Sequence, residues 1–218
     1  ALTAKVKDAI ALLSIPKYEE ASDDAPVDMT TVIVNNGFEA GNISGWTNSG
    51  TIDAQSQNNA SFDNKQGTYY GEKWHVNGTV DINQTLAHLP AGTYELTAYA
   101  YSTATDCILY ANGISVPVTE TSGLYTVVVK LAADGDPLKI GVSWSDSGDK
   151  WTCMDEFTLT YYGAASAKEE TSSTDIEGVD SSAAVTPVAI YTISGVKVDA
   201  MQKGLNIVKC PDGSTKKI

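Results

Sequence analysis

Apolar and polar residues alternate with a period of two along the middle of the chain, between residues 80 and 161. In 80–86, for example, Val80, Ile82 and Leu86 alternate with polar neighbours. Successive side chains of a strand point to opposite faces, so this segment is predicted to be a half-buried strand. The same reasoning predicts further strands at 95–101, 108–110, 116–118, 125–131, 138–144 and 156–161, and a short β-branched strand at 31–34.

Turn-forming Gly, Asn, Asp and Pro residues separate these segments, and no helical pattern lies between them. Parallel strands need long crossover connections, whereas antiparallel strands are joined by short turns. The pattern therefore predicts an all-β protein built on an antiparallel β-sandwich over residues 31–163.

Different patterns flank this region. In residues 1–15 apolar side chains recur at helical spacing, which predicts a short N-terminal helix that Pro16 ends. The acidic, polar residues after it predict a linker, so 1–30 are expected to form a helix and an acidic linker. Residues 164–186 are small, acidic and rich in Ser and Thr, and predict a flexible linker.

Residues 187–218 carry three short strand patterns, at 188–193, 196–198 and 205–208. The segment is too short to build a core of its own. It is predicted to be a small C-terminal β-module that docks on another domain or is recognised by another protein.

Charge excludes some partners. The chain carries 14 basic residues, all of them Lys, against 27 acidic ones, and its net charge is −13. Nucleic-acid binding needs cationic side chains that displace phosphate counterions, so we expect no nucleic-acid partner. No apolar run approaches the roughly 20 residues of a membrane span, and no membrane span is expected.

Cysteine and histidine offer little metal chemistry. His75 and His88 are the only histidines, and Cys107, Cys153 and Cys210 lack metal-ligand spacing. Cys107 and Cys153 both fall in strand-like segments, so they are either a disulfide or two small buried side chains.

Four motifs resemble those of galactose-binding-domain-like jelly rolls, a family that includes many carbohydrate-binding modules. The first is NNGFEAG at 35–41, followed by Gly45-Trp46; three others follow in the family's order, YYGEKW at 69–74, LPAGTY at 89–94 and WTCMDEFTL at 151–159. The resemblance implies a jelly-roll β-sandwich and, as a function, binding of a polysaccharide or oligosaccharide.

The C-terminal residues carry a second resemblance. The stretches IYTISGVKV at 190–198 and KGLNIV at 203–208 are similar to C-terminal modules of secreted bacterial polysaccharide-degrading proteins, related to the sorting domains of type IX secretion. This similarity implies a bacterial protein that is secreted or held at the cell surface, with further domains as partners.

The first resemblance also implies a structural Ca²⁺ ion held by Glu39 and Asp155 together with backbone carbonyls. Ca²⁺ takes six to eight hard oxygen ligands, and two carboxylates from distant parts of the chain would be tied together by it. The alternative is that Glu39 and Asp155 accept hydrogen bonds from backbone N–H groups at strand ends.

Aromatic residues mark a candidate sugar site. Sugars present flat C–H faces to aromatic rings and hydroxyl groups to polar side chains. Trp74, Tyr70 and Trp151 are predicted to line the site, with Asp146, from the polar loop 145–150, or Glu72 as hydroxyl partners. The alternative is that these aromatics are core or edge residues, which we expect of Trp46.

Hydrolysis is not favoured. A glycosidase needs two carboxylates on either side of a sugar. Asp155 and Glu156 are adjacent on a predicted strand, so their side chains are expected to point to opposite faces. No nucleophile elbow, phosphate loop or zinc-protease motif occurs.

The predicted function is therefore non-catalytic carbohydrate binding by a module of a secreted or cell-surface bacterial protein. The alternative is a structural or adhesive β-sandwich, a scaffold or docking domain without a sugar site. Trp74, Tyr70 and Trp151 exposed together in a cleft would favour the first reading, and their burial apart from one another the second.

Overall fold

The structure is a computed structural model, and it describes residues 13, 15–49, 52–57, 61–171, 189–192, 197–198, 206–209 and 215–217. The chain divides into two compact units, Ala1–Asp175 and Ile176–Ile218, which are described separately. Thirteen strands and one short 3₁₀ helix are assigned in the described residues. The prediction of an all-β protein is confirmed.

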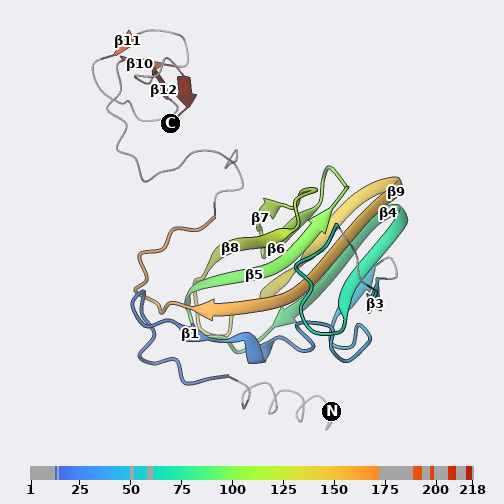
Figure 1. Cartoon of the computed structure of the whole chain (residues 1–218). Helices are drawn as coiled ribbons and strands as arrows, with labels where there is room; N and C mark the ends of the chain where they lie inside the picture. Colours follow the sequence, from blue (N-terminus) through green and yellow to red (C-terminus); the bar gives the residue numbers. More distant parts are fainter. Residues whose placement is uncertain are drawn as a thin grey trace. The chain divides into compact units, whose positions relative to one another are not determined.

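Two long strands, β4 (Tyr70–Leu86) and β9 (Leu138–Tyr161), organise the first unit. They pair antiparallel from Gly71↔Met154 to Leu86↔Leu138 and arch together from one layer of the sandwich into the other (Figure 1). Layer A contains the first half of β4 and the second half of β9, with β3 (Asp53–Gln55), β5 (Gly92–Ser102) and β8 (Gly123–Leu131).

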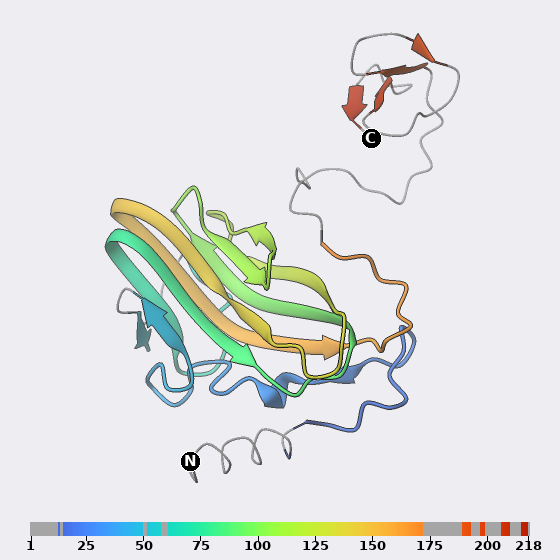
Figure 2. The ribbon, with the colours of Figure 1, turned by 180° about the vertical axis from the view of Figure 1, so that it is seen from behind.

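Layer B contains the other halves of β4 and β9. Its remaining strands are β2 (Thr47–Ser49), β6 (Ile108–Ala111) and β7 (Ile114–Pro117). A short β1 (Val27–Asp28) pairs with the end of β9. All these pairings are antiparallel, as predicted, and the view from behind shows the same two layers (Figure 2).

The alternating apolar side chains fill the space between the layers. Ile82 of layer B and Leu96 and Leu159 of layer A have no exposed surface. Burial of each such side chain contributes about 1.5–3 kcal/mol relative to exposure. Trp46 is buried, as expected, and packs on Phe38 and Phe157 with ring centroids 5.6 and 4.6 Å away, so that the first and last family-like motifs meet in the core.

A smaller apolar cluster lies on the outer face of layer A. It contains Phe62, Tyr70, Tyr101 and Cys153, with Tyr99 and Trp151 packed against it. Tyr101 and Cys153 are register partners, and their chain neighbours Ala100 and Met154 face the main core. This outer face is therefore partly covered by aromatic rings instead of being wholly polar.

The predicted strand at 31–34 is wrong. Thr30–Val32 form a 3₁₀ helix, in which the N–H of Ile33 donates to the carbonyl of Thr30 at 2.9 Å. Met29 and Ile33 are both buried on either side of this turn. A second i→i+3 hydrogen bond closes the turn, because the N–H of Val32 donates to the carbonyl of Met29 at 3.0 Å.

The predicted loop at 145–150 is also wrong. These residues belong to β9 and pair with β4, for instance Thr79↔Ser145 and Val76↔Gly148. They form the arch between the layers, where Gly78 and Gly148 adopt positive φ angles of 103° and 108°. An arch that leaves the core needs no apolar alternation, and its polar sequence therefore resembles that of a loop.

The first unit extends beyond the predicted boundaries. Ile15, Tyr18 and Ala21 pack against the core, although they fall in the predicted helix and acidic linker. At the other end Thr171 donates its backbone N–H to the carbonyl of Val128 on β8 at 2.9 Å. Most of the predicted N-terminal helix lies outside the described residues; Leu13, which is helical, is 86% exposed.

The second unit contains a four-stranded antiparallel sheet in the order β11-β10-β12-β13. Its strands are β10 (Ala189–Thr192), β11 (Lys197–Val198), β12 (Asn206–Lys209) and β13 (Thr215–Lys217). Three of them fall on the predicted strand patterns, and β13 was not predicted. This sheet is the expected small C-terminal β-module.

Cys107 and Cys153 are both buried and are not joined in a disulfide, so the alternative of two small buried side chains is the one observed. Burial raises the pKa of the Cys107 thiol to about 12.

Gly141 of β9 offers a test of the packing between strands. A Cβ atom there would lie 2.3 Å from the backbone oxygen of Ile82 and 2.9 Å from the hydroxyl of Tyr110. We expect Gly141→Ala to lower the free energy of unfolding by about 1–3 kcal/mol or more, measured by urea denaturation. Gly123→Ala is the control, because a Cβ atom there meets nothing within 4 Å, and it should change stability by less than about 0.5 kcal/mol. Equal effects of the two substitutions would contradict this account of the packing.

Candidate functional site

The outer face of layer A carries a hollow of about 290 Å³ lined by Glu72, Trp74 and Trp151. Trp74 of β4 and Trp151 of β9 are direct register partners, and Glu72 precedes Trp74 by two residues on the same face. Trp74 is 62% exposed, and Trp151 and Glu72 are half-buried. Three of the five predicted ligand residues therefore lie together.

A bulge in β4 lies directly beside this hollow. The β4–β9 register shifts between Trp74 and Val76, and the intervening His75 has a positive φ angle of 60°. The Nδ1 atom of His75 lies 2.6 Å from an Asp149 carboxylate oxygen on the opposite strand. Bulges bend a strand and redirect its side chains, and this one interrupts the β4–β9 ladder next to Trp74 before the pairing resumes at Val76↔Gly148.

Trp151 is held more firmly than Trp74. Its ring packs edge-on against Tyr101 with centroids 6.0 Å apart, and its backbone N–H donates to the Thr103 hydroxyl at 2.8 Å. Its indole N–H is buried and has no hydrogen-bond partner among the described residues. The hollow thus combines the indole of Trp151, which is held by its contacts with Tyr101 and Thr103, with the exposed indole of Trp74.

Tyr70 occupies a different place from the one predicted. Its side chain is only 1% exposed and packs on Phe62, so the ring offers no surface to a ligand. Its hydroxyl donates to Glu72 Oε2 at 2.7 Å, and the Cys153 thiol lies 3.8 Å from the same oxygen. Tyr70 therefore positions the Glu72 carboxylate from beneath.

The fifth predicted residue, Asp146, belongs to the arch, where its backbone pairs with Gly78. Its side chain lies outside the described residues.

Sequence reasoning missed the contribution of Tyr101, which supports Trp151. The signal was present in the alternation of Tyr99 and Tyr101 with Ala98 and Ala100, whose small side chains face the core.

Asp155 and Glu39 lie apart from this hollow, next to the loop 64–69. The Asp155 carboxylate has no exposed surface and accepts backbone N–H groups of Gln66 and Glu156, both at 2.9 Å. One oxygen of Glu39 accepts the N–H groups of Thr68 and Tyr69, both at 2.8 Å. Both carboxylates satisfy backbone donors, as the second alternative expected, and both still have oxygen lone pairs to offer a cation.

Asp155 and Glu156 do not point to opposite faces, and that expectation is wrong. Glu156 has a positive φ angle of 47°, and the β5–β9 register shifts beside it, between Thr97 and Tyr99. A Cβ atom at Gly37 would lie 2.7 Å from a Glu156 carboxylate oxygen and 3.6 Å from an Asp155 carboxylate oxygen. The bulge turns both carboxylates toward the same glycine.

The electrostatics of Asp155 follow from this placement. Burial raises its pKa to about 7, the two backbone N–H groups oppose the shift, and the carboxylates of Glu156 and Glu39 add to it. Within the described part of the chain, no three His, Cys, Asp or Glu side chains are grouped as metal ligands would be. A cation at this place would therefore depend on backbone carbonyls as well.

Comparison with known proteins gives structural likenesses only. No family model and no curated protein matches the sequence. The chain is similar in structure to a family 61 carbohydrate-binding module, TmCBM61, solved in complex with β-1,4-galactotriose, with 23% identity, a TM-score of 0.48 and coverage of 58% of this chain and 95% of that one.

Two other solved structures show the same kind of likeness. The CBM22-1 xylan-binding domain of Paenibacillus barcinonensis Xyn10C is 17% identical, with a TM-score of 0.41 over 60% of this chain and 94% of its own. A CBM4 structure is 13% identical, with a TM-score of 0.42 over 59% and 99%. These neighbours are carbohydrate-binding modules.

The described part of the chain contains no helix with the length and hydropathy needed to span a membrane.

The raised pKa of Asp155 predicts a pH dependence of stability. The folded chain keeps Asp155 protonated over a range in which the unfolded chain, with a pKa near 3.8, has released the proton. With chelator present, the contribution of Asp155 to the free energy of unfolding should be greatest below about pH 4. It should fall by a few kcal/mol between about pH 4 and about pH 7, the folded pKa, and stay low above that.

Urea denaturation across this pH range measures the effect. Asp155→Asn should remove most of the slope, whereas Asp63→Asn, at an exposed position, should leave it unchanged. An unaltered slope in Asp155→Asn would show that another group is responsible.

Proposed function

We propose that this chain is a non-catalytic carbohydrate-binding module of a secreted or cell-surface bacterial protein, and that the hollow of Glu72, Trp74 and Trp151 holds the sugar. The observation that carries the proposal is an exposed indole beside a carboxylate of fixed orientation in an open hollow. A large exposed aromatic next to a positioned polar group is a typical arrangement for binding at a protein surface.

Each residue has a defined role in this proposal. Trp74 offers its ring to the C–H face of a sugar, and the edge-packed Trp151 forms the adjoining wall. Because the Tyr70 hydroxyl occupies Oε2 of Glu72, Oε1 accepts a sugar hydroxyl. A carboxylate at the hollow of a chain with net charge −13 favours a neutral glycan over a uronic-acid polymer.

The proposed role is binding without hydrolysis. Glycoside hydrolysis takes a pair of carboxylates facing each other across the sugar. Glu72 is the one carboxylate among the described residues that line the hollow. Asp155 and Glu156 are directed toward Gly37, and Asp155 is buried and engaged with backbone N–H groups.

A shallow polar site binds a single sugar weakly, because few stacked faces offset the loss of translational freedom. Further domains of a larger protein would raise the avidity for a polysaccharide through multivalency. The C-terminal β-sheet suits such an arrangement, and we take it to be the part recognised during secretion, as its similarity to type IX sorting domains implies.

A structural Ca²⁺ ion is a further part of the proposal. Glu39 and Asp155 would hold it with backbone carbonyls, and the ion would tie the start of the sandwich to its last strand. The support is electrostatic: burial raises the pKa of Asp155 to about 7, and the carboxylates of Glu156 and Glu39 add to the shift. A bound divalent cation would remove that repulsion.

Affinity electrophoresis in gels containing neutral galactan, xylan or β-glucan tests the sugar site. We expect the wild-type chain to be retarded in at least one gel and Trp74→Ala to lose about tenfold or more in affinity, because the stacking surface is removed. Tyr70→Phe should cost only a few-fold, since Glu72 remains but is no longer held.

Val34→Ala is the matched control, because Val34 is a 57% exposed apolar residue in the 34–37 turn, where its N–H donates to Gln84 Oε1. Unchanged affinity of Trp74→Ala would place the site elsewhere. The absence of retardation in every gel would favour the scaffold alternative.

Thermal unfolding with and without Ca²⁺ tests the ion. Saturating Ca²⁺ should raise the Tm of the wild-type chain by several degrees, because about 2–3 kcal/mol of linkage energy accompanies a hundredfold excess over Kd. Asp155→Asn should abolish the rise, and Asp63→Asn should retain it. An identical Tm with Ca²⁺ and with chelator would count against Glu39 and Asp155 as ligands.

A further inference from the structure

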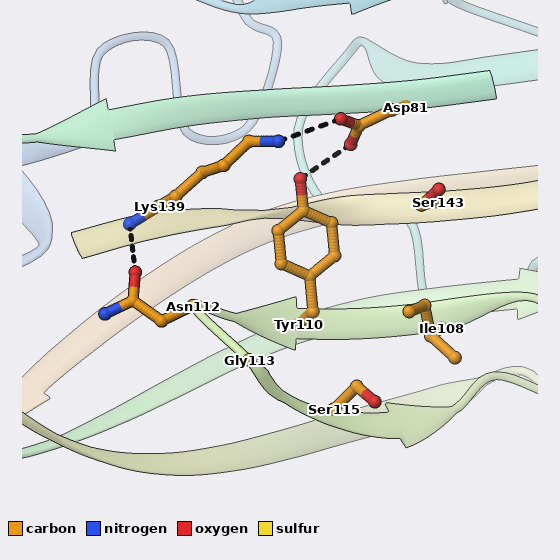
Figure 3. A pocket seen from close by; sticks show the side chains of 8 residues that line it. All are labelled: Asp81, Ile108, Tyr110, Asn112, Gly113, Ser115, Lys139 and Ser143. Carbon is orange, nitrogen blue, oxygen red and sulfur yellow. Dashed lines mark hydrogen bonds and ion pairs between the residues drawn. The ribbon is translucent and has the colours of Figure 1, made fainter.

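A second hollow, of about 270 Å³, lies on the outer face of layer B (Figure 3). Val80, Ile82 and Val142 face the core, so Asp81 and Ser143, which alternate with them, face outward. Its lining includes Asp81 from β4, Ile108 and Tyr110 from β6, Ser115 from β7, and Lys139 and Ser143 from β9.

Small residues of β9 create the space. Ser143 stands between Ile108 of β6 and Asp81 of β4 in one row of the sheet. In the next row Gly141 has no side chain, and the Tyr110 ring extends across β9 toward β4 (Figure 3). The open space that remains, called the trough here, lies over Ser143 beside the Tyr110 ring, with Ile108 and Asp81 on its two sides.

The polar groups of this trough have fixed positions. Asp81 Oδ1 accepts the Tyr110 hydroxyl at 2.6 Å, and Oδ2 accepts Asn83 Nδ2 at 2.9 Å and Lys139 Nζ at 3.0 Å. The Lys139 ammonium also lies 5.4 Å from the centroid of the Tyr110 ring. The Asn112 side chain accepts the backbone N–H of Lys139 at 2.8 Å. These bonds place a carboxylate acceptor and an ammonium donor side by side.

We propose that this hollow is a second carbohydrate site, which takes one unit of a neutral saccharide. Adjacent sugar hydroxyls can donate to Asp81 and accept from Lys139, which is 44% exposed and retains further N–H donors. The carboxylate and the ammonium cancel, which favours an uncharged ligand although the chain is strongly acidic. Ile108 supplies an apolar surface for the C–H groups of a sugar.

The hydrogen-bond network also holds β6 against β4, but that structural role does not require the open space beside it. The trough and the hollow of Trp74 lie on opposite faces of the sandwich. A module with both sites occupied therefore joins two glycan chains, which a single site cannot do.

NMR titration of the ¹⁵N-labelled chain with D-galactose, D-glucose and D-xylose tests the proposal, because it locates weak binding residue by residue. We expect at least one sugar to shift the amide signals of Asp81, Tyr110 and Ser115 with saturable, millimolar affinity. Ser115→Tyr fills the trough from β7, where Ser115 is the register partner of Tyr110, and should remove these shifts. Asp81→Asn should weaken binding at least several-fold. Thr121→Tyr, at an exposed position outside both hollows, is the control and should retain the shifts.

Trp74→Ala separates this site from the first one. It should leave the shifts at Asp81 and Tyr110 intact while it removes those around Trp151. No saturable shift at the trough with any of the three sugars, or shifts that survive Ser115→Tyr, would overturn the proposal. Shifts at the trough without any at Trp151 would uphold it and refute the first site instead.

Discussion

The continuous pairing of β4 with β9 is the constraint on which the rest of the structure depends. One ribbon runs through both layers, and its register changes by one residue at the bulge between Trp74 and Val76, from Gly71↔Met154 on one side to Leu86↔Leu138 on the other. A shift by one residue would turn every side chain of both strands to the opposite face. The core, the arch and both outer faces follow from this single alignment.

The ribbon also explains why candidate binding groups occur on the outside of both layers. In the layer A half of the ribbon Trp74 pairs with Trp151, and in the layer B half Asp81 pairs with Ser143. Each hollow is then completed by an adjacent tyrosine whose hydroxyl fixes a carboxylate: Tyr70 holds Glu72, and Tyr110 holds Asp81. Burial of these rings gives the polar groups defined positions, because the tyrosines themselves cannot move freely.

The chain distributes its negative charge in three physically different ways. Glu72 is held by neutral donors at an open surface, and Asp81 is balanced by Lys139. Asp155 is buried beside other carboxylates, which raises its pKa to about 7. The first two arrangements favour neutral ligands that offer hydroxyl groups, whereas the third favours either a proton or a cation.

The sequence by itself determined the strands whose side chains alternate between core and solvent, the burial of Trp46 and the proximity of Trp74 to Trp151. Each of these depends on local periodicity or on motifs whose order reflects the fold. Only the tertiary structure decided that 30–32 forms a turn, that 145–150 belongs to a strand, that Tyr70 lies beneath the site and that Asp155 and Glu156 face the same glycine. The physical reason is that these features depend on which distant backbone supplies the hydrogen-bond partner, and a β-bulge or an arch leaves no periodic pattern in the residues that form it.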